Sequence, residues 1–208
     1  MIARAHRASS CYLVDSGRFA SEDLTPYKEM ARYLLARGLP PLDLSRAKSL
    51  EEVLSACSGC YGTEGIRSLR NIPDGSVDFL WSNAVLEHVR LGEFFDTLKE
   101  LRRVIRPGGV CSHRVDLKDH LGYALNNLRF SEDLWESNFF ARSGFYTNRI
   151  RHSEMLDLFR EAGFSSEVVG IDRWARLPTR LAKMAKKYRG LSEDELLIFG
   201  FDVILRPL

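Results

Sequence analysis

Polar side chains that could bind a ligand follow three short apolar runs, residues 11–14, 77–81 and 110–115. Runs of this length and composition are typical of buried strands. In an open parallel sheet, ligands lie beyond the carboxyl ends of the strands. The sequence therefore predicts one ligand site built from the residues at these ends. These residues are Asp15, Ser16, Gly17, Ser82, Asn83 and Asp116.

Two of the candidate residues suit defined chemistry. The carboxylate of Asp15 could accept two hydrogen bonds from a diol, although an Asp at a strand end also commonly begins a loop. His88 follows Asn83 by five positions, and its ordinary pKa near neutrality suits a general base that takes a proton from a hydroxyl or an amine. The alternative for His88 is a purely structural role, in which it orients its loop.

The elements that would position these residues are clearest between residues 74 and 116. An apolar run at 77–82 predicts a strand with helices over both faces. From Phe94 onward, apolar residues recur at helical spacing as far as Ile105, and Pro107-Gly108-Gly109 predicts the end of that helix. A second strand is expected at 110–115. Strand, helix and strand in this order form a right-handed crossover, so we expect an α/β protein.

The block DGSVDFLWSNAVLEHV, followed by LRRVIRPGGV, resembles the fourth and fifth strands of class I S-adenosylmethionine-dependent methyltransferases of the type 11-like group. Residues 11–15 resemble the second strand of that family, and 153–164 resemble a late helix that ends at Gly163. Residues 167–172 and 197–205 resemble its last two strands, an antiparallel pair at one sheet edge. The resemblance implies a Rossmann-like, doubly wound, mostly parallel sheet.

The resemblance also implies a cofactor and a reaction. The cofactor would be S-adenosylmethionine, with Asp15 on the ribose, Thr63 and Glu64 near the adenine, and Ser82 and Asn83 on the methyl side. The reaction would be in-line methyl transfer to a small-molecule or glycan-like acceptor. Candidate acceptor contacts crowd the end of the strand at 110–115 or lie in the segment that follows. They are Asp116, His120, Tyr146 and Arg149.

Residues 117–150 interrupt the alternation of strands and helices. They are rich in aromatic, Asn and Arg side chains. Members of the family commonly carry substrate-recognition insertions at this point, so this segment is interpreted as a substrate lid within a single methyltransferase-like domain spanning 1–208. A structural insertion packed over the sheet is the alternative.

One departure from the family pattern concerns cofactor binding. No glycine-rich turn precedes Cys11, so by resemblance the first strand of the sheet is expected to be missing. The incomplete sheet would then favour self-association. The alternative function is a catalytically inactive, methyltransferase-like interaction or regulatory protein. A nicotinamide-dependent oxidoreductase fits less well, because the chain has no GxGxxG turn.

Composition adds weaker constraints. A net charge of +2 is too small to argue for nucleic acid or a membrane as a general partner, so no nucleic acid is expected. No apolar run approaches the roughly 20 residues of a membrane span, so a cytoplasmic protein is expected. Cys57 and Cys60 have the spacing of half a zinc site, but no second pair of ligands follows, and no metal is expected. The basic stretch 173–189 is interpreted as an amphipathic helix with a solvated face, or with a face for an anionic acceptor or a membrane surface.

Overall fold

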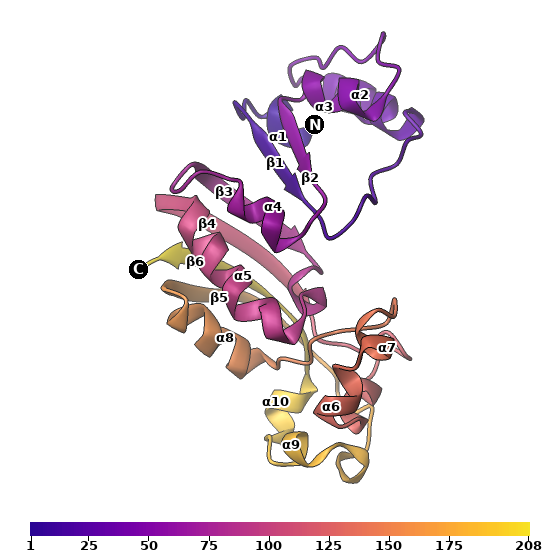
Figure 1. Cartoon of the computed structure of the whole chain (residues 1–208), viewed down its shortest axis with the longest axis vertical. Coiled ribbons are helices and arrows are strands. Elements are labelled where there is room, and N and C mark those ends of the chain that lie inside the picture. The colour runs from indigo at the N-terminus through magenta and orange to yellow at the C-terminus, as the bar shows by residue number, and fades with distance from the viewer. The chain divides into compact units, whose positions relative to one another are not determined.

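A computed structural model describes residues 1–208, and the chain divides into two compact units, Met1–Ile72 and Pro73–Leu208. Each unit is described by itself (Figure 1). The expectation of a single domain over 1–208 stays a prediction. The elements of the first unit are α1 (Ile2–Ala5), β1 (Cys11–Val14), α2 (Thr25–Ala36), α3 (Leu50–Ala56), β2 (Gly59–Gly62) and α4 (Ile66–Arg70).

The first unit has a two-stranded parallel sheet. β1 and β2 pair from Cys11 opposite Gly59 to Val14 opposite Gly62, so their carboxyl ends lie at the same edge. Side chains cap the start of α3. The Ser49 hydroxyl accepts a hydrogen bond from Glu52 N at 3.3 Å, and the Glu52 carboxylate accepts one from Lys48 N at 2.7 Å.

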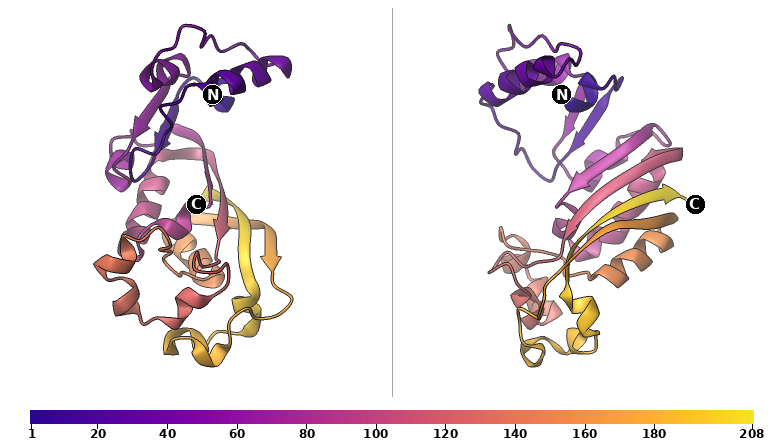
Figure 2. Two further views of the ribbon diagram at one scale, coloured as in Figure 1. Left: turned by 90° about the vertical axis from the view of Figure 1, so that its right-hand side faces the viewer. Right: turned by 180° about the vertical axis from the view of Figure 1, so that it is seen from behind.

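The second unit is built on a four-stranded sheet in the order β3-β4-β6-β5. β3 and β4 are parallel, and β6 runs antiparallel to both of its neighbours. Helices α5 and α8 lie against one face (Figures 1 and 2). The α/β class and the C-terminal antiparallel pair are therefore confirmed. The main elements are β3 (Val77–Asn83), α5 (Leu91–Val104), β4 (Ile105–Asp116), α8 (His152–Glu161), β5 (Phe164–Arg173) and β6 (Ile198–Pro207).

The apolar residues of α5 and α8 form the core of this unit with the strands. Phe94 and Leu98 of α5 and Phe159 of α8 are almost fully buried, as are Cys111 and Val203 of the sheet. Burying apolar surface of this kind is the main stabilising contribution to the unit.

Of the two helix ends predicted from glycine and proline positions, one is confirmed and one is wrong. Gly163 comes directly after the C-cap of α8 and has φ +90°, a left-handed conformation that glycine adopts without steric cost, so the predicted stop is confirmed. The stop predicted at Pro107-Gly108-Gly109 is wrong in position. α5 ends at Val104, and β4 begins at once with Ile105, which pairs with Val77. The proline and glycines therefore lie inside the first part of a strand.

β3 is not the fully covered strand that its apolar sequence predicted. It is an edge strand, and none of its residues is classed as buried. Phe79 and Trp81, which share one face of the strand, are 61% and 65% exposed. The expectation was wrong because an apolar run identifies a strand without fixing its place in the sheet.

A cap, defined as residues 117–150 and 174–197, follows the ends of β4 and β5. It has its own small core, in which Leu125 and Leu128 from the first segment meet Met184, Tyr188 and Leu196 from the second. The short elements of the cap are η2 (Asn126–Arg129), α6 (Glu132–Trp135), α7 (Asn138–Ala141), η3 (Leu181–Lys183), α9 (Lys186–Arg189) and α10 (Glu193–Leu197).

The amphipathic helix expected over 173–189 is not formed. The segment contains the end of β5, a loop with Pro178, then η3 and the four-residue α9. Proline lacks the backbone N–H that a continuous helix needs. The apolar positions that suggested helical spacing serve the cap core instead, through Met184 and Tyr188. None of the helices has the length and apolar character needed to cross a membrane.

Candidate functional site

The carboxyl ends of β3 and β4 lie side by side in the second unit. The strands are parallel, and Asn83 at the end of β3 pairs with Arg114, two residues before the end of β4 at Asp116. The chain then turns sharply at Ala84, whose φ of +52° is rare for a residue with a side chain and whose N–H donates to Arg114 O at 2.9 Å. Strained backbone of this kind is found most often at functional sites.

His88 ends the short helix η1 (Leu86–His88) that follows this turn. Its Nδ1 lies 3.0 Å from the carbonyl oxygen of Tyr146. A carbonyl only accepts hydrogen bonds, so Nδ1 carries the proton and Nε2 of the neutral ring is left with a free lone pair. Partial burial of the ring lowers the pKa of His88 below its usual value. At neutral pH the ring is therefore an uncharged base.

The segment around Tyr146 is tied to the loop after β3 by several hydrogen bonds. Asn148 Nδ2 donates to Leu86 O at 2.8 Å and to Val89 O at 3.0 Å, and Asn148 N donates to Glu87 O at 2.7 Å. The Tyr146 hydroxyl accepts from Leu91 N at 3.1 Å and donates to the Glu136 carboxylate at 2.9 Å. The cap thus holds the carbonyl that orients His88. Sequence reasoning missed Asn148 in this role.

His120 and Asp116, two of the predicted acceptor contacts, lie in this region. The ring of exposed His120 stands edge-on to that of His88, with 4.9 Å between centroids. Asp116 is partly buried, accepts a hydrogen bond from Lys118 N at 2.9 Å and pairs with Lys118 Nζ at 3.4 Å. His88, His120 and Asp116 together present two imidazole rings and a carboxylate.

Glu87 is the second residue that sequence reasoning missed. It is 2% exposed, and neither of its carboxyl oxygens has a hydrogen-bond partner. Burial raises the pKa of Glu87 to about 8, and the Asp116 carboxylate acts in the same direction. Glu87 is therefore mostly protonated at neutral pH. No periodicity in the sequence distinguishes this buried acid from an exposed one.

Besides Tyr146, whose hydroxyl is bound by Leu91 and Glu136, two more predicted site residues have side chains that are engaged elsewhere. Arg149 is 4% exposed, and its guanidinium lies over the rings of Trp135 and Tyr188 inside the cap, at 5.3 and 5.6 Å from their centroids. The hydroxyl of Ser82 lies 2.7 Å from Nδ1 of buried His113, whose pKa is lowered to about 4 by burial. Asn83, the next residue along β3, is exposed.

The predicted cofactor contacts of the first unit come together at the carboxyl edge of its sheet. Asp15 N donates to Gly62 O at 2.9 Å, and Gly65 N donates to Asp15 O at 2.8 Å. The loops after β1 and β2 are thereby joined, which brings Asp15, Ser16 and Gly17 beside Thr63 and Glu64. One oxygen of the Asp15 carboxylate accepts from Ser16 N at 2.8 Å, and the other has no partner in the protein.

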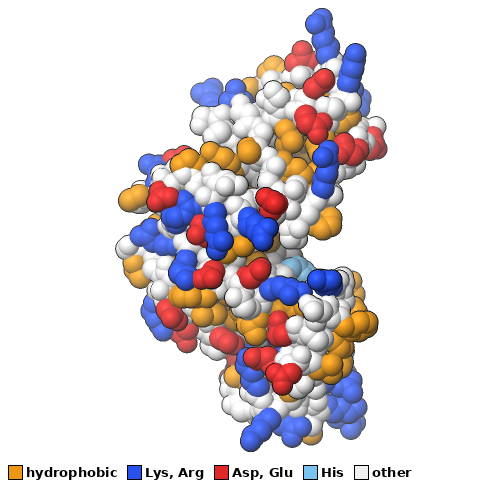
Figure 3. All heavy atoms as spheres, viewed as in Figure 1, with side chains coloured by type: hydrophobic (Ala, Val, Ile, Leu, Met, Phe, Trp, Pro, Cys, Tyr) orange, Lys and Arg blue, Asp and Glu red, His pale blue; other side chains and the backbone are white.

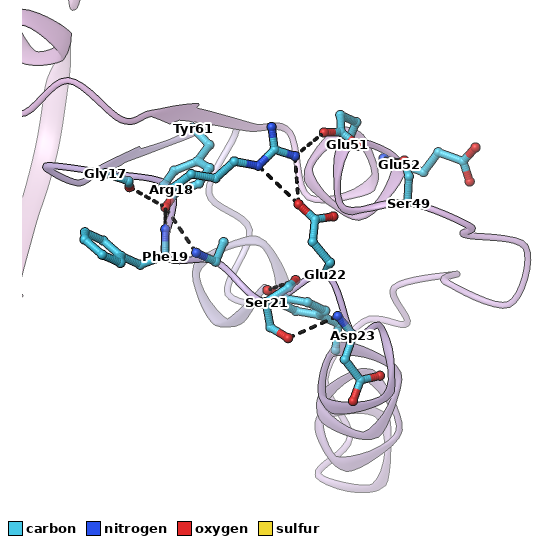
Figure 4. Close-up of polar contacts among 12 residues, drawn as sticks. Gly17, Arg18, Phe19, Ser21, Glu22, Asp23, Ser49, Glu51, Glu52 and Tyr61 are labelled. Carbon is cyan, nitrogen blue, oxygen red and sulfur yellow. Dashed lines mark hydrogen bonds and ion pairs between the residues drawn. The ribbon is translucent and has the colours of Figure 1, made fainter.

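Tyr61 fixes the loop that follows Asp15. Its hydroxyl donates to Gly17 O at 3.1 Å and accepts from Phe19 N at 3.0 Å and Ala20 N at 3.2 Å (Figure 4). Three backbone groups are satisfied by one side chain, so the loop is held close to β2. The loop after β2 is fixed by Ser68, whose hydroxyl accepts from Glu64 N at 3.0 Å.

The polar groups at the carboxyl edge of the first unit's sheet suit the hydroxyls of a nucleoside ribose. A carboxylate with one unoccupied oxygen can accept hydrogen bonds from ribose hydroxyls, and the joined loops present further backbone groups nearby.

Cys57 and Cys60 are free thiols, the first buried and the second exposed. No group of three or more His, Cys, Asp or Glu side chains is arranged to hold a metal ion.

Comparison with known proteins gives the same fold. Residues 43–112 match the model of the methyltransferase domain family. A solved S-adenosylmethionine-dependent methyltransferase from Methanosarcina mazei aligns with a TM-score of 0.55 and 16% identity, over 100% of this chain and 86% of that one. The chain therefore has the class I methyltransferase fold, as its sequence predicted.

Two further solved structures align less closely. An arsenic(III) S-adenosylmethionine methyltransferase from Chlamydomonas reinhardtii has a TM-score of 0.49 and 16% identity, over 96% of this chain and 55% of that one. A chain from the complex between a methyltransferase activator and a putative methyltransferase of Haloferax volcanii has a TM-score of 0.40 and 15% identity, over 99% and 87%. No curated protein sequence matches the chain.

Proposed function

We propose that this chain is an S-adenosylmethionine-dependent methyltransferase that methylates a hydroxyl or amine of a small-molecule or glycan-like acceptor. The fold and the family match over residues 43–112 support the class of reaction. The observation that carries the chemistry is His88, a neutral imidazole whose proton is held on Nδ1 by Tyr146 O. Its Nε2 is free to take the proton that the acceptor must lose.

The cofactor would be held by residues of the first unit. S-adenosylmethionine supplies an activated methyl group when it is bound. The unoccupied oxygen of Asp15 would accept from the ribose hydroxyls, with Ser16 and Gly17 beside it and Thr63 and Glu64 near the adenine. The loops are held in place before binding, by Tyr61 on one side and Ser68 on the other, so little ordering cost remains.

The acceptor would be oriented by residues of the second unit. His120 stands beside His88, Asp116 is close enough to act on the pKa of His88, and both can bind hydroxyl or amine groups. Asn83 ends β3 just before the turn that leads to His88. Tyr146 contributes its carbonyl, because its hydroxyl is already engaged by Leu91 and Glu136. The proposal includes residues 117–150 as a substrate lid, because this segment contains Tyr146, whose carbonyl orients His88. A positioned base of this kind accelerates proton transfer by about 10²–10⁴-fold.

Titration of the chain with S-adenosylmethionine tests the cofactor half. Asp15→Ala is expected to weaken binding roughly 10- to 100-fold, the value of a charge-assisted hydrogen bond. Asp43→Ala is the matched control, since Asp43 is an exposed acid of the same unit whose carboxylate is used within its own loop by Ser45. Equal affinities of the two variants would refute the role of Asp15.

His88→Asn tests the acceptor half. An Asn amide can still donate to Tyr146 O but cannot act as a base. Methyl transfer is expected to fall by at least 100-fold while cofactor affinity stays unchanged. Full turnover by this variant would show that His88 only orients its loop.

A catalytically inactive interaction or regulatory protein is the alternative. It predicts no cofactor binding by wild type, which the same titration measures.

Self-association is part of either proposal, because edge strand β3 exposes Phe79 and Trp81. Sedimentation at increasing concentration is expected to show dimers that Trp81→Lys weakens. A strictly monomeric wild type would exclude this.

A further inference from the structure

Residues 173–189, called the basic segment below, carry positive charge without any acidic residue. Seven of the 17 residues are Lys or Arg, and all seven are exposed. Figure 3 shows such side chains gathered at the end of the second unit formed by α9 and the loop before it. The seven are Arg173, Arg176, Arg180, Lys183, Lys186, Lys187 and Arg189.

Most of this charge is not neutralised within the protein. Lys187 pairs with Glu132 at 2.8 Å, whereas Arg173 and Arg189 reach only backbone carbonyls. The other four cations of the segment have no hydrogen bond or ion pair from their side chains. α10 supplies Glu193, Asp194 and Glu195 nearby, but none of them pairs with these four. An uncompensated cluster of like charges raises the local potential and attracts an anionic partner.

A hollow lies within the basic segment. Its volume is about 600 Å³, large enough for a lipid headgroup. Two guanidinium groups and four apolar or aromatic side chains line it, without any acid. The lining residues are Trp174, Ala175, Arg176, Leu177, Pro178 and Arg180.

The segment is presented on a rigid base. Met184 and Tyr188 are buried in the cap core, and Ala185 N donates to Leu128 O at 2.8 Å. Just before these anchors in the chain, Leu181 remains 38% exposed beside Arg180. Exposed cations with an apolar tip among them suit the boundary between lipid headgroups and acyl chains.

We infer that the basic segment docks onto an anionic lipid membrane, with a headgroup phosphate in the hollow between Arg176 and Arg180. Lys183 and Lys186 contact neighbouring headgroups, and Leu181 reaches the acyl boundary. A small soluble anion would need only the two arginines, whereas four unpaired cations spread over 11 residues match an extended anionic surface. Each Lys or Arg held near an anionic lipid surface adds favourable electrostatic attraction.

Vesicle co-sedimentation tests this surface. Wild type is expected to bind phosphatidylcholine vesicles that contain phosphatidylglycerol, to bind less as salt increases, and to ignore vesicles of phosphatidylcholine alone. Changing Arg176, Arg180, Lys183 and Lys186 to Gln should weaken binding roughly 100- to 1,000-fold, since each basic residue near the surface contributes about fivefold. Vesicle binding needs neither cofactor nor acceptor, so its outcome is independent of methyl transfer.

A control variant separates the patch from net charge. Arg32, Arg46, Arg67 and Arg70 are exposed cations of the first unit, and changing all four to Gln removes the same charge. This variant should bind vesicles like wild type. Failure of wild type to bind anionic vesicles would overturn the membrane surface, as would equal losses in the two variants. Binding to heparin without binding to vesicles would also overturn it, because the partner would then be a soluble polyanion.

Discussion

Glu87→Gln is expected to stabilise the second unit at neutral pH. The carboxyl group is 2% exposed and has no hydrogen-bond partner, and burial raises its pKa from 4.5 to about 8. Because the pKa of Glu87 is higher in the folded state, the folded protein keeps a proton on Glu87 that the unfolded chain releases between pH 4.5 and about 8. Stability is therefore lost as pH rises from 4.5 to 8, by about 1.4 kcal/mol per pH unit.

The size of the effect follows from this interval. At pH 7 the cost of Glu87 is about 3 kcal/mol, and above pH 8 it levels off near about 5 kcal/mol. Gln has nearly the same shape and cannot ionise, so the variant avoids this cost. Below pH 4 both side chains are neutral, and the two proteins should unfold with similar free energies.

Urea unfolding followed by tryptophan fluorescence measures this difference. All three tryptophans, Trp81, Trp135 and Trp174, belong to the second unit, so the signal reports on that unit. Unfolding free energies at pH 4, 7 and 8.5 should diverge progressively between wild type and Glu87→Gln. Glu161→Gln, a change at an exposed acid of α8, should show no such divergence. A difference independent of pH, or a loss of stability at pH 7, would mean that Glu87 is ionised and paired. Arg114, whose charge acts to lower the pKa of Glu87, would then be the first partner to examine.

Three further predictions concern groups that hold the sites in place. Arg151→Met should lower the unfolding free energy by about 3 kcal/mol or more, because the fully buried guanidinium donates hydrogen bonds to Leu117 O, where the cap begins, and to Ile198 O, just after it ends. Urea unfolding followed by tryptophan fluorescence measures this loss. Asn148→Ala should free the cap from the loop after β3, seen as faster amide exchange in residues 84–90 with the rest of the unit unchanged. Methyl transfer should fall on the acid side with an apparent pKa below 6.5, because burial lowers the pKa of His88 and only its neutral form accepts a proton; a rate profile with an acid limb above 7 would contradict this.

Strand and helix order could be predicted because local patterns determine it. A short apolar run marks the strand at 77–82, helical spacing of apolar residues marks the helix that follows, and Gly163 stops α8 as its position suggested. The position of a strand within its sheet is decided by pairing between distant residues. No pattern inside residues 77–82 shows that β3 lies at an edge, and the exposure of Phe79 and Trp81 was missed for that reason.

The same distinction between local patterns and distant contacts applies to the candidate site residues. Asp15 and Asp116 could be named as candidates because they lie at strand ends, which can be recognised locally. The burial of Glu87 and the hydrogen bonds of Asn148 to the loop after β3 could not be predicted, because they depend on contacts between residues about 60 positions apart. Arg149 was predicted as an acceptor contact from its place in the chain, and the structure places its guanidinium on Trp135. Burial of a charged residue depends on tertiary packing and has no periodic signal.

The chemistry of His88 depends on the cap as much as on its own strand. Tyr146 O holds the proton on Nδ1, and burial is the main reason for the low pKa of the ring. Opening the cap would remove the carbonyl and admit water, so the pKa of His88 would return toward its usual value and Nε2 would lose its fixed role. The ring therefore keeps its low pKa and its fixed orientation while Asn148 and Tyr146 hold the cap against the loop after β3. Under the proposed function, an acceptor that strengthened these contacts would also fix the base, so acceptor binding and proton removal would be coupled.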